Sequence, residues 1–327
     1  MKTVAFFNNK GGVGKTSLAF HISWMLKKLG HNVLAADFDP QANLTRMCMD
    51  ESRIEKVLQN KQSAFNALEP LIQGTGDIKN ADIYKVTEGF GLLPGSLELS
   101  GIEADFSDSW PKCMDGNPRS FRVITAFSRL MKQAGEEWKA DWGVIDMGPN
   151  LGAINRAVLI ASNYVVFPLG PDLFSFQGLK NVGNFLNRWK KEWDDRKDKK
   201  PDSLNFALPE GDMVPVGYVM MRHSIRHDRP VQAYQRWMNK MPIAYRKYVL
   251  QEREMDTPSE QDQYLLAHLK DYRSLMPMAQ EKTKPIFLLK PGDGAIGAHY
   301  NAVQECYKDF KSLTKKIIST CEKNTSV

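Results

Sequence analysis

Cysteine is scarce in this chain of 327 residues, which contains only four. They are Cys48, Cys113, Cys306 and Cys321, and no two of them form a C-x-x-C pair. Cysteine-ligated metal sites and iron–sulfur sites need clustered cysteines, so we expect these four to be reduced structural thiols. The sequence also has no internal repeat and no low-complexity tract.

Long hydrophobic runs are missing as well. The first apolar run, 4–7, is far too short for a signal peptide or a membrane span. No later run approaches the roughly 18 apolar residues that a spanning helix needs. The last helical pattern has one apolar face, which is more typical of packing on a domain than of insertion into lipid. The sequence therefore predicts a cytoplasmic protein with no membrane partner.

Neither sign of charge is in large excess. The formal net charge is +6, and 25% of residues are charged and 42% hydrophobic, as in an ordinary globular protein. A charge of this size is compatible with polyanion binding but too small to demonstrate it. The length is sufficient to bury a sizeable core, and we expect one domain over residues 1–327.

Short apolar runs alternate with helical patterns along the chain. Several of the runs are apolar without alternation, which indicates strands covered on both faces. The expected strands are 3–8, 32–38, 89–94, 142–146, 164–168, 214–221 and 285–289, and 16–29 is an expected helix. This order predicts a three-layer α/β/α fold with a mostly parallel sheet, whose ligands bind at the carboxyl ends of the strands.

The segment 223–283 fits this alternation poorly. It shows no convincing strand, but aromatic and long apolar residues occur at helical spacing, namely Tyr234, Trp237, Met238, Met241, Tyr245 and Tyr248. The segment is too apolar to be disordered. We therefore expect a helical insertion packed on the sheet domain.

A glycine-rich loop, KGGVGKT at 10–16, follows the first expected strand and precedes the expected helix. Glycines allow a tight turn in which successive N–H groups point at phosphate oxygens. Lys15 would contact the β and γ phosphates of a nucleotide, and the Thr16 hydroxyl would be a ligand of Mg²⁺. The helix that follows adds the positive end of its dipole.

Carboxylates follow two of the expected strands. Asp37 and Asp39 are two residues apart at the end of the second strand, and therefore on the same side of it. Asp146 ends the apolar strand of WGVIDMGPN, where a carboxylate could hold a water molecule bound to Mg²⁺. With the glycine-rich loop, these segments predict a nucleotide-hydrolase site.

The loop and both carboxylate segments are similar to those of the ParA/Soj/MinD group of P-loop ATPases. The resemblance continues through LLPGSLELSGIE, FPLGPDLFSFQGL and PVGYVMMR and into KPIFLLKPGDGAIGAHYNAV, and it leaves the segment 223–283 unmatched. It implies ATP and Mg²⁺ as ligands, and slow ATP hydrolysis that a partner protein stimulates. These motifs are highly specific for the group and weakly specific for a biological role.

The resemblance also implies roles for individual residues. Two ATP-bound subunits would dock face to face, and Lys10 would reach the partner's phosphates, much as an arginine finger does. Asp39 would position the attacking water, with Asp37 beside it in the first switch, and 147–150 would form the second switch. The implied nucleotide contacts are Gly11, Gly12, Val13, Gly14, Lys15, Thr16, Ser17, Pro168 and Arg222, and the implied Mg²⁺ site is Thr16, Asp39 and Asp146.

Two departures from the group's pattern are visible. Gly148 precedes Pro149 where the group commonly has two prolines, which would loosen the second switch. Met221 stands where an Asn or Thr often reads the adenine edge, so base recognition would rely on backbone groups in 168–172. ATP, rather than GTP, is therefore inferred from the resemblance.

Two hypotheses from different classes describe what such a switch acts on. The favoured one is a DNA-segregation or cargo-positioning ATPase whose dimer binds non-specific DNA through basic residues. The basic residues are Arg222, Arg226, Arg229, Arg236, Lys240, Arg246, Lys247 and the lysines of the last helix. No helix-turn-helix precedes the first strand, so we do not expect operator recognition. The alternative is a regulatory ATPase that docks a protein complex through 223–283.

Overall fold

Apolar runs without alternation form the centre of a sheet. The structure, a computed structural model, describes residues 1–221, 231–252, 262–272 and 274–325. The strands are β1 (Lys2–Phe6), β2 (Val33–Asp37), β3 (Tyr84–Thr87), β4 (Phe90–Leu93), β5 (Trp142–Asp146), β6 (Tyr164–Leu169), β7 (Val214–Met221) and β8 (Leu265–Leu269). They form one sheet in the order β3-β4-β2-β5-β1-β6-β7-β8, in which only the β3–β4 pair is antiparallel.

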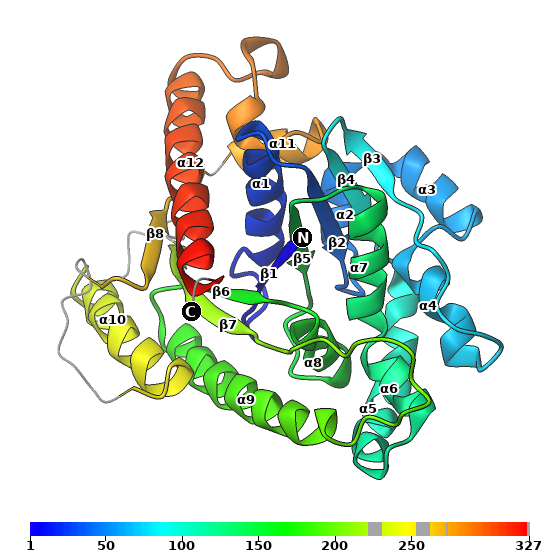
Figure 1. Ribbon diagram of the computed structural model, residues 1–327. Coiled ribbons are helices and arrows are strands. Elements are labelled where there is room, and N and C mark those ends of the chain that lie inside the picture. Colours follow the sequence, from blue (N-terminus) through cyan, green and yellow to red (C-terminus); the bar gives the residue numbers. More distant parts are fainter. Residues whose placement is uncertain (222–230, 253–261, 273, 326–327) are drawn as a thin grey trace.

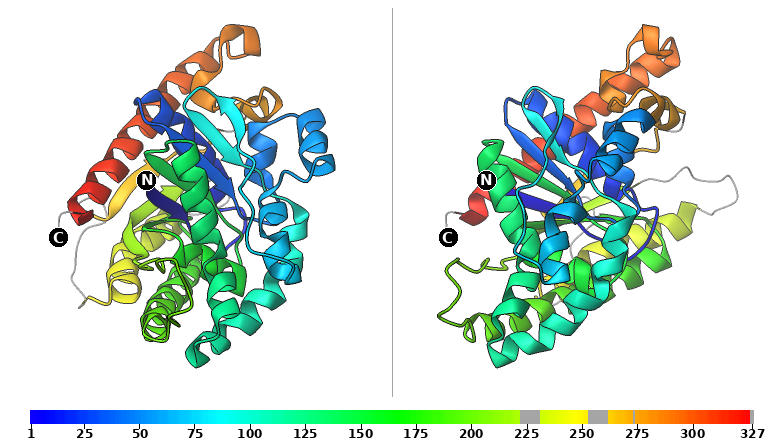
Figure 2. Two further views of the ribbon diagram at one scale, coloured as in Figure 1. Left: turned by 45° about the vertical axis from the view of Figure 1, so that its right-hand side comes forward. Right: turned by 90° about the vertical axis from the view of Figure 1, so that its right-hand side faces the viewer.

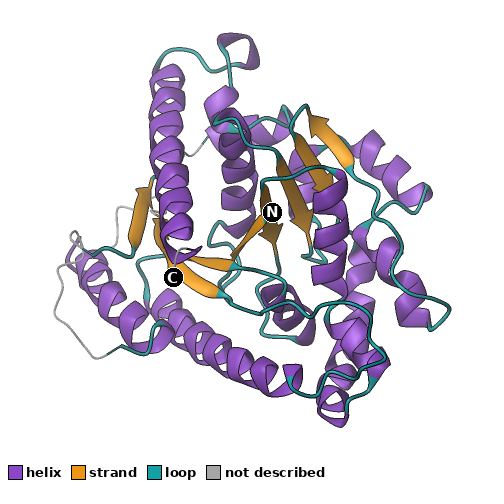
Figure 3. Cartoon of the chain, viewed as in Figure 1, coloured by secondary structure: helices purple, strands orange, loops and turns teal. Residues whose placement is uncertain are grey.

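Helices cover both faces of this sheet (Figure 3). One face carries α4 (Ala64–Gln73), α5 (Glu103–Lys112), α6 (Pro118–Ile124), α7 (Ala126–Glu137), α8 (Ala153–Ile160), α9 (Leu173–Lys197) and α10 (Val231–Ala244). The other carries α1 (Lys15–Lys28), α2 (Asn43–Cys48), α3 (Glu51–Gln59), α11 (Leu275–Glu281) and α12 (Ala298–Thr325). In both views of Figure 2, α12 and α9 lie on opposite sides of the sheet. The predicted three-layer α/β/α fold is confirmed.

The alternation of side chains along each strand divides the core in two. Val4 and Phe6 of β1 pack with α1 and α12, whereas Ala5 and the following Phe7 pack on the other face. All four are fully buried. Strands buried on both faces read as continuous apolar runs, which is why the sequence pattern located the central strands.

The predicted strand at 285–289 is wrong. Ile286–Leu288 form a short 3₁₀ helix, and Ile286 and Phe287 are buried against α1 and α12. The Ile286 amide donates a hydrogen bond to Nε2 of His21, so it takes no part in a strand ladder. The apolar run marks burial under helices instead of membership of the sheet.

The prediction that 223–283 contains no strand is also wrong. β8 pairs in parallel with β7 and extends the sheet by one strand at this edge. The described helices of this segment are α10, which continues into a π-helical turn, Tyr245–Val249, and α11, which follows β8. The segment therefore contributes to the sheet as well as to its helical cover.

The helix expected at 16–29 corresponds to α1, which lies beside α12 (Figure 1). Parallel strands β1, β2, β5 and β6 all end at the same edge of the sheet. The loops that follow them, including residues 7–14 and 147–152, meet there. Among the described residues, we find no helix with both the length and the apolar character of a membrane span.

Candidate functional site

The loop between β1 and α1 has the tight turn that its glycines predict. Gly12 and Gly14 have φ values of +71° and +91°, in the left-handed region that strains residues with a side chain. A Cβ at Gly14 would also lie 2.7 Å from Cε of Met221, so Met221 packs closely on the loop, and the backbone conformation is what requires glycine there. Gly11 is exposed and Val13 is buried. Thr16 and Ser17 lie half-buried in the first turn of α1.

Lys15 begins α1 and is only 7% exposed. Its Nζ donates to the carbonyl of Lys10 at 3.3 Å, across the loop. Burial lowers the pKa of Lys15, while the carboxylates of Asp146 and Asp39 act in the opposite direction. The predicted lysine and two of the predicted aspartates are therefore close enough to interact.

The two strand-end aspartates meet across the sheet. Asp37 and Asp146 are directly opposite each other where β2 pairs with β5, and both are fully buried. One Asp37 oxygen accepts hydrogen bonds from the amide and the hydroxyl of Thr45, each at 2.7 Å. Asp37 thus ties the end of β2 to α2.

Burial raises the pKa of Asp146 well above its ordinary value, and the neighbouring Asp37 raises it further. The pKa of Asp37 is also raised by burial, to about 7, despite the hydrogen bonds from Thr45. Among the described residues, neither Asp146 oxygen has a hydrogen-bond partner of ordinary geometry, although the Thr16 hydroxyl lies near enough to lower its pKa, and one Asp37 oxygen has no partner. Buried carboxylates without partners are costly unless a cation compensates them.

These residues fit a magnesium ion. Carboxylate and hydroxyl oxygens are the ligands that Mg²⁺ prefers, and the groups that act on the Asp146 carboxylate include Thr16 and Asp39. Asp39 is 7% exposed, and one of its oxygens accepts a hydrogen bond from the Gln41 amide at 3.0 Å. Thr16, Asp39 and Asp146 are therefore close enough to act on one another, and their binding of Mg²⁺ remains a prediction.

The second predicted switch, 147–150, is held by groups that the sequence interpretation missed. Nδ2 of Asn155 donates to the carbonyls of Gly148 and Asn150, at 2.9 and 2.7 Å. A Cβ at Gly148 would lie 3.4 Å from Oδ1 of Asp39. The second switch therefore packs directly against Asp39, and Asn155 fixes its path.

The carboxylate of Glu103 accepts hydrogen bonds from the amides of Ala153 and Ile154, the first residues of α8. This contact connects the segment 92–103 to the helix that follows the second switch. The resemblance to the ATPase group identified this segment, but Glu103 and its partners in α8 are about 50 residues apart in sequence. No local pattern could have revealed it.

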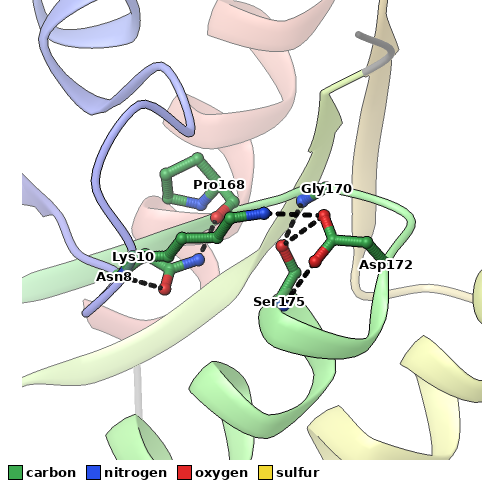
Figure 4. Close-up of polar contacts among 6 residues, drawn as sticks. All are labelled: Asn8, Lys10, Pro168, Gly170, Asp172 and Ser175. Atoms are coloured by element: carbon green, nitrogen blue, oxygen red, sulfur yellow. Dashed lines mark hydrogen bonds and ion pairs between the residues drawn. The ribbon is translucent and has the colours of Figure 1, made fainter. Parts of the chain in front are cut away.

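Lys10 forms an ion pair with Asp172, with Nζ 2.8 Å from Oδ2 (Figure 4). The amide of Lys10 donates to Oδ1 of Asn8, and Nδ2 of Asn8 donates to the carbonyl of Pro168 at 2.7 Å. The sequence interpretation singled out neither Asn8 nor the role of Asp172. Asn8 is 1% exposed and joins the phosphate loop to the end of β6.

The base contacts remain predictions. Pro168 lies near the end of β6, with its carbonyl accepting the bond from Asn8. Arg222 lies outside the described residues, together with Arg226 and Arg229. Met221, which precedes it, lies against Gly14 of the phosphate loop.

The prediction that Arg246 contacts DNA phosphates is wrong. Arg246 is 8% exposed and pairs with Asp262, which is 4% exposed, at 3.1 Å. Asp262 also accepts a hydrogen bond from the Tyr218 hydroxyl of β7 at 2.7 Å. Arg246 therefore holds the π-helical turn against the sheet and is not available to a polyanion.

The profile of a family described as an AAA domain matches residues 1–198 of this chain. The chain belongs to this family. A curated relative, the virulence plasmid ParA family protein of Chlamydia psittaci, is 28% identical over 191 residues, which cover 57% of this chain and 64% of the relative. Together these matches confirm a ParA-like P-loop ATPase family member. The chain spans less than two thirds of the length of curated relatives that it matches.

Solved structures share the fold over almost the whole chain. A protein from Corynebacterium diphtheriae has a TM-score of 0.73 at 22% identity, covering 99% of this chain and 100% of that one. An McdA variant from Cyanothece in complex with ATP has a TM-score of 0.63 at 15% identity, covering 97% and 96%. At these identities, the likeness shows the fold alone.

Proposed function

We propose that this protein is a cytoplasmic, Mg²⁺-dependent ATPase of the ParA type that dimerises when it binds ATP. The observation that carries the proposal is the burial of Asp37 and Asp146, opposite each other, beside Lys15 at the mouth of a glycine-rich loop. A buried pair of carboxylates with unpaired oxygens next to a phosphate loop suits a magnesium nucleotide. The McdA variant of the same fold is described with ATP.

Each residue has a task in this proposal. Lys15 and the loop amides bind the β and γ phosphates, Thr16 and Asp146 hold Mg²⁺, and Asp39 orients the attacking water. When bound, Mg²⁺ would neutralise phosphate charge and favour breakage of the bond to the γ-phosphate. Gly148, packed against Asp39, couples the second switch to the water position.

Lys10 supplies the second half of the proposal. Two triphosphates that face each other repel, and a cation contributed by the opposite protomer offsets that charge. The same cation stabilises the charge that develops during phosphoryl transfer. Hydrolysis to ADP and phosphate then removes the γ-phosphate that Lys10 of the opposite protomer contacts, and the dimer dissociates. The enzyme therefore acts as a timed switch.

We propose further that the ATP-bound dimer binds non-specific DNA and serves in plasmid or chromosome partition or in cargo positioning, with a partner protein that stimulates hydrolysis. A relative is described as a virulence plasmid ParA family protein. In α10, the cations of Arg236 and Lys240 lie 5.9 and 5.1 Å from the Trp237 ring. Lys308 and Lys315 are exposed and seven residues apart, on one face of α12.

A ParA-like regulator of a protein complex is the second candidate. Aromatic and basic groups of α10 are also suited to a protein interface. The Phe176 ring of α9 contacts the Trp237 ring, with centroids 5.7 Å apart. This contact connects α10 to α9, whose N-cap residue Asp172 pairs with Lys10.

The test is the binding of the Asp39→Ala protein to random-sequence duplex DNA, with ATP or ADP, over a series of salt concentrations. We expect binding with ATP only, falling steeply as salt rises, since each phosphate contact releases counterions. Arg236→Ala should reduce the salt slope by about 1. An ATP-induced dimer that does not bind DNA would refute the partition proposal and favour the regulator.

A further inference from the structure

The ammonium group of Lys10 is already engaged within its own protomer. Nζ lies 2.8 Å from Oδ2 of Asp172, and the two side chains are 33% and 19% exposed. Partial burial strengthens such a charge-assisted hydrogen bond relative to one at an open surface. To contact the phosphates of a second protomer, Lys10 must leave this carboxylate or share it.

Asp172 is held rigidly, because it is the N-cap of α9. Its Oδ1 accepts a hydrogen bond from the Ser175 amide at 2.9 Å, and its Oδ2 accepts one from the Ser175 hydroxyl at 3.2 Å. The Ser175 hydroxyl in turn accepts from the Gly170 amide. Figure 4 shows the carboxylate between Lys10 and Ser175. A carboxylate fixed by its helix presents a defined position to Lys10.

The loop that carries Lys10 is docked on the same helix. A Cβ at Gly178 of α9 would lie 2.7 Å from Oδ1 of Asn9, so loop and helix are in close contact. Asn8 fixes the loop to the carbonyl of Pro168. The ion pair therefore joins two segments that are already positioned and does not depend on a chance meeting of flexible side chains.

Large apolar side chains next to Asp172 are exposed. Leu173 is 43% and Phe174 69% exposed, in the first turn of α9. They lie beside Lys10, whose proposed task is in the opposite protomer. Exposed apolar groups of this size often mark an interface, and a second copy of the chain is suited to cover them.

We propose that Asp172 is a positioning residue that holds Lys10 in cis in the free protomer and thereby restrains ATP-dependent dimerisation. This inference rests on the proposed function, in which Lys10 acts on the partner's phosphates. Release of Lys10 is then part of the cost of forming the dimer. Since two Lys10 residues must be released, the restraint enters the dimer dissociation constant twice.

The size of the effect follows from this doubling. A partly buried ion pair that lowers the population of free Lys10 about fivefold per protomer would weaken the dimer about 25-fold. Burial alone would raise the pKa of Asp172, but the hydrogen bonds from Lys10 and Ser175 outweigh it and leave the pKa below its ordinary value. The carboxylate is therefore charged at neutral pH, and the ion pair with Lys10 is present there.

The variant that tests the restraint is Asp172→Asn. Asparagine is as good an N-cap as aspartate, so α9 keeps its cap while the charge that holds Lys10 is removed. Asp194→Asn is the matched control, because Asp194 lies on the same helix and pairs with Lys197 at 3.0 Å. Asp172→Ser, which also caps a helix, replaces Asp172→Asn if that protein does not fold.

Dimerisation is measured in the Asp39→Ala background with ATP over a range of protein concentrations. We expect Asp172→Asn to lower the dimer dissociation constant by about 25-fold, and Asp194→Asn to leave it unchanged. The effect should vanish when Lys10→Ala is added, because no lysine is then left to hold. An unchanged or weaker dimer in Asp172→Asn with Lys10 present would overturn the proposal.

A second readout does not need a dimer. The rate at which an amine-acylating reagent modifies Lys10 in the nucleotide-free protein should rise at least about threefold in Asp172→Asn, relative to Asp194→Asn, because a side chain released from its ion pair with Asp172 is more accessible to the reagent. Equal rates would overturn the restraint even if the dimer formed. An Asp39→Ala protein that never dimerises would instead refute the proposed function, and the acylation rates would still decide the contact between Lys10 and Asp172.

Discussion

The amide and the hydroxyl of Thr45 both donate to the same oxygen of Asp37, each at 2.7 Å, and Asp37 is fully buried. The pair connects the end of β2 to α2 and fixes one oxygen of the Asp37 carboxylate. The Thr45 hydroxyl also accepts a hydrogen bond from the Gly95 amide at 2.9 Å. One hydroxyl therefore holds three segments around the site.

Replacing this hydroxyl should lower stability. Thr45→Val removes a hydrogen bond to a buried carboxylate and leaves the Gly95 amide without its partner, so we expect a loss of about 2 kcal/mol in the free energy of unfolding. Urea denaturation of the nucleotide-free protein measures it. Thr320→Val, which removes a hydroxyl bonded to the Lys316 carbonyl on α12, should cost far less. Equal losses in the two variants would argue against the role given to Thr45.

Removing the side chain of Lys10 should separate binding from turnover. In Lys10→Ala we expect the affinity of one protomer for ATP to stay within about threefold, because Lys15 and the loop amides remain, while the ATPase rate falls at least about 100-fold. Lys15→Ala, by contrast, should lose nucleotide binding. Titration with a fluorescent ATP analogue and a phosphate-release assay give the two quantities. A Lys10→Ala enzyme with the parent's rate would remove the in-trans explanation.

His21 makes the stability of the protein depend on pH. It is fully buried, and burial lowers its pKa from the usual 6.5 to about 4, although the bond with the Ser17 carbonyl opposes this. Nδ1 donates to that carbonyl at 2.7 Å, and Nε2 accepts from the Ile286 amide, so both nitrogens are used in the neutral form. As pH falls below about 6.5, the unfolded chain takes up a proton that the folded protein refuses until about pH 4.

Stability should therefore fall as the solution is acidified through this window, by about 3 kcal/mol from His21 alone. His21→Asn should be less stable than the parent at neutral pH but should lose about 3 kcal/mol less over the same window. Urea denaturation at several pH values gives both slopes, with His31→Gln as the control that follows the parent. Parallel curves for the parent and His21→Asn would show that His21 is not responsible.

Central features of the fold were predictable because each has a local signature. β1, β2, β5, β6 and β7 are continuous buried runs, and the phosphate loop needs its glycines wherever it occurs. β8 escaped prediction because its five residues, LLAHL, are a short run without alternation, and they lie in the sheet through pairing with β7. The run at 285–289 was predicted as a strand because it is apolar, but it is buried by packing against α1 and α12 and not by pairing in the sheet.

The candidate site was predictable only as far as its motifs extend. Asp37, Asp39 and Asp146 lie near Lys15 because β2, β5 and the phosphate loop meet at one edge of the sheet, and the roles of these residues remain predictions. The contacts of Asn8 with Pro168 and of Lys10 with Asp172 each span about 160 residues, and no periodicity encodes them. Arg246 was misplaced because a positive charge on a helical pattern gives no sign of a buried partner such as Asp262.

The central claim is that ATP makes two copies of this chain associate. The most direct test is the mass in solution of the Asp39→Ala protein, which should bind ATP without turning it over, measured by sedimentation with saturating ATP and with ADP. We predict twice the protomer mass of 37.1 kDa with ATP and the protomer mass with ADP. The protomer mass with both nucleotides, when binding measurements show the sites filled, would contradict the account.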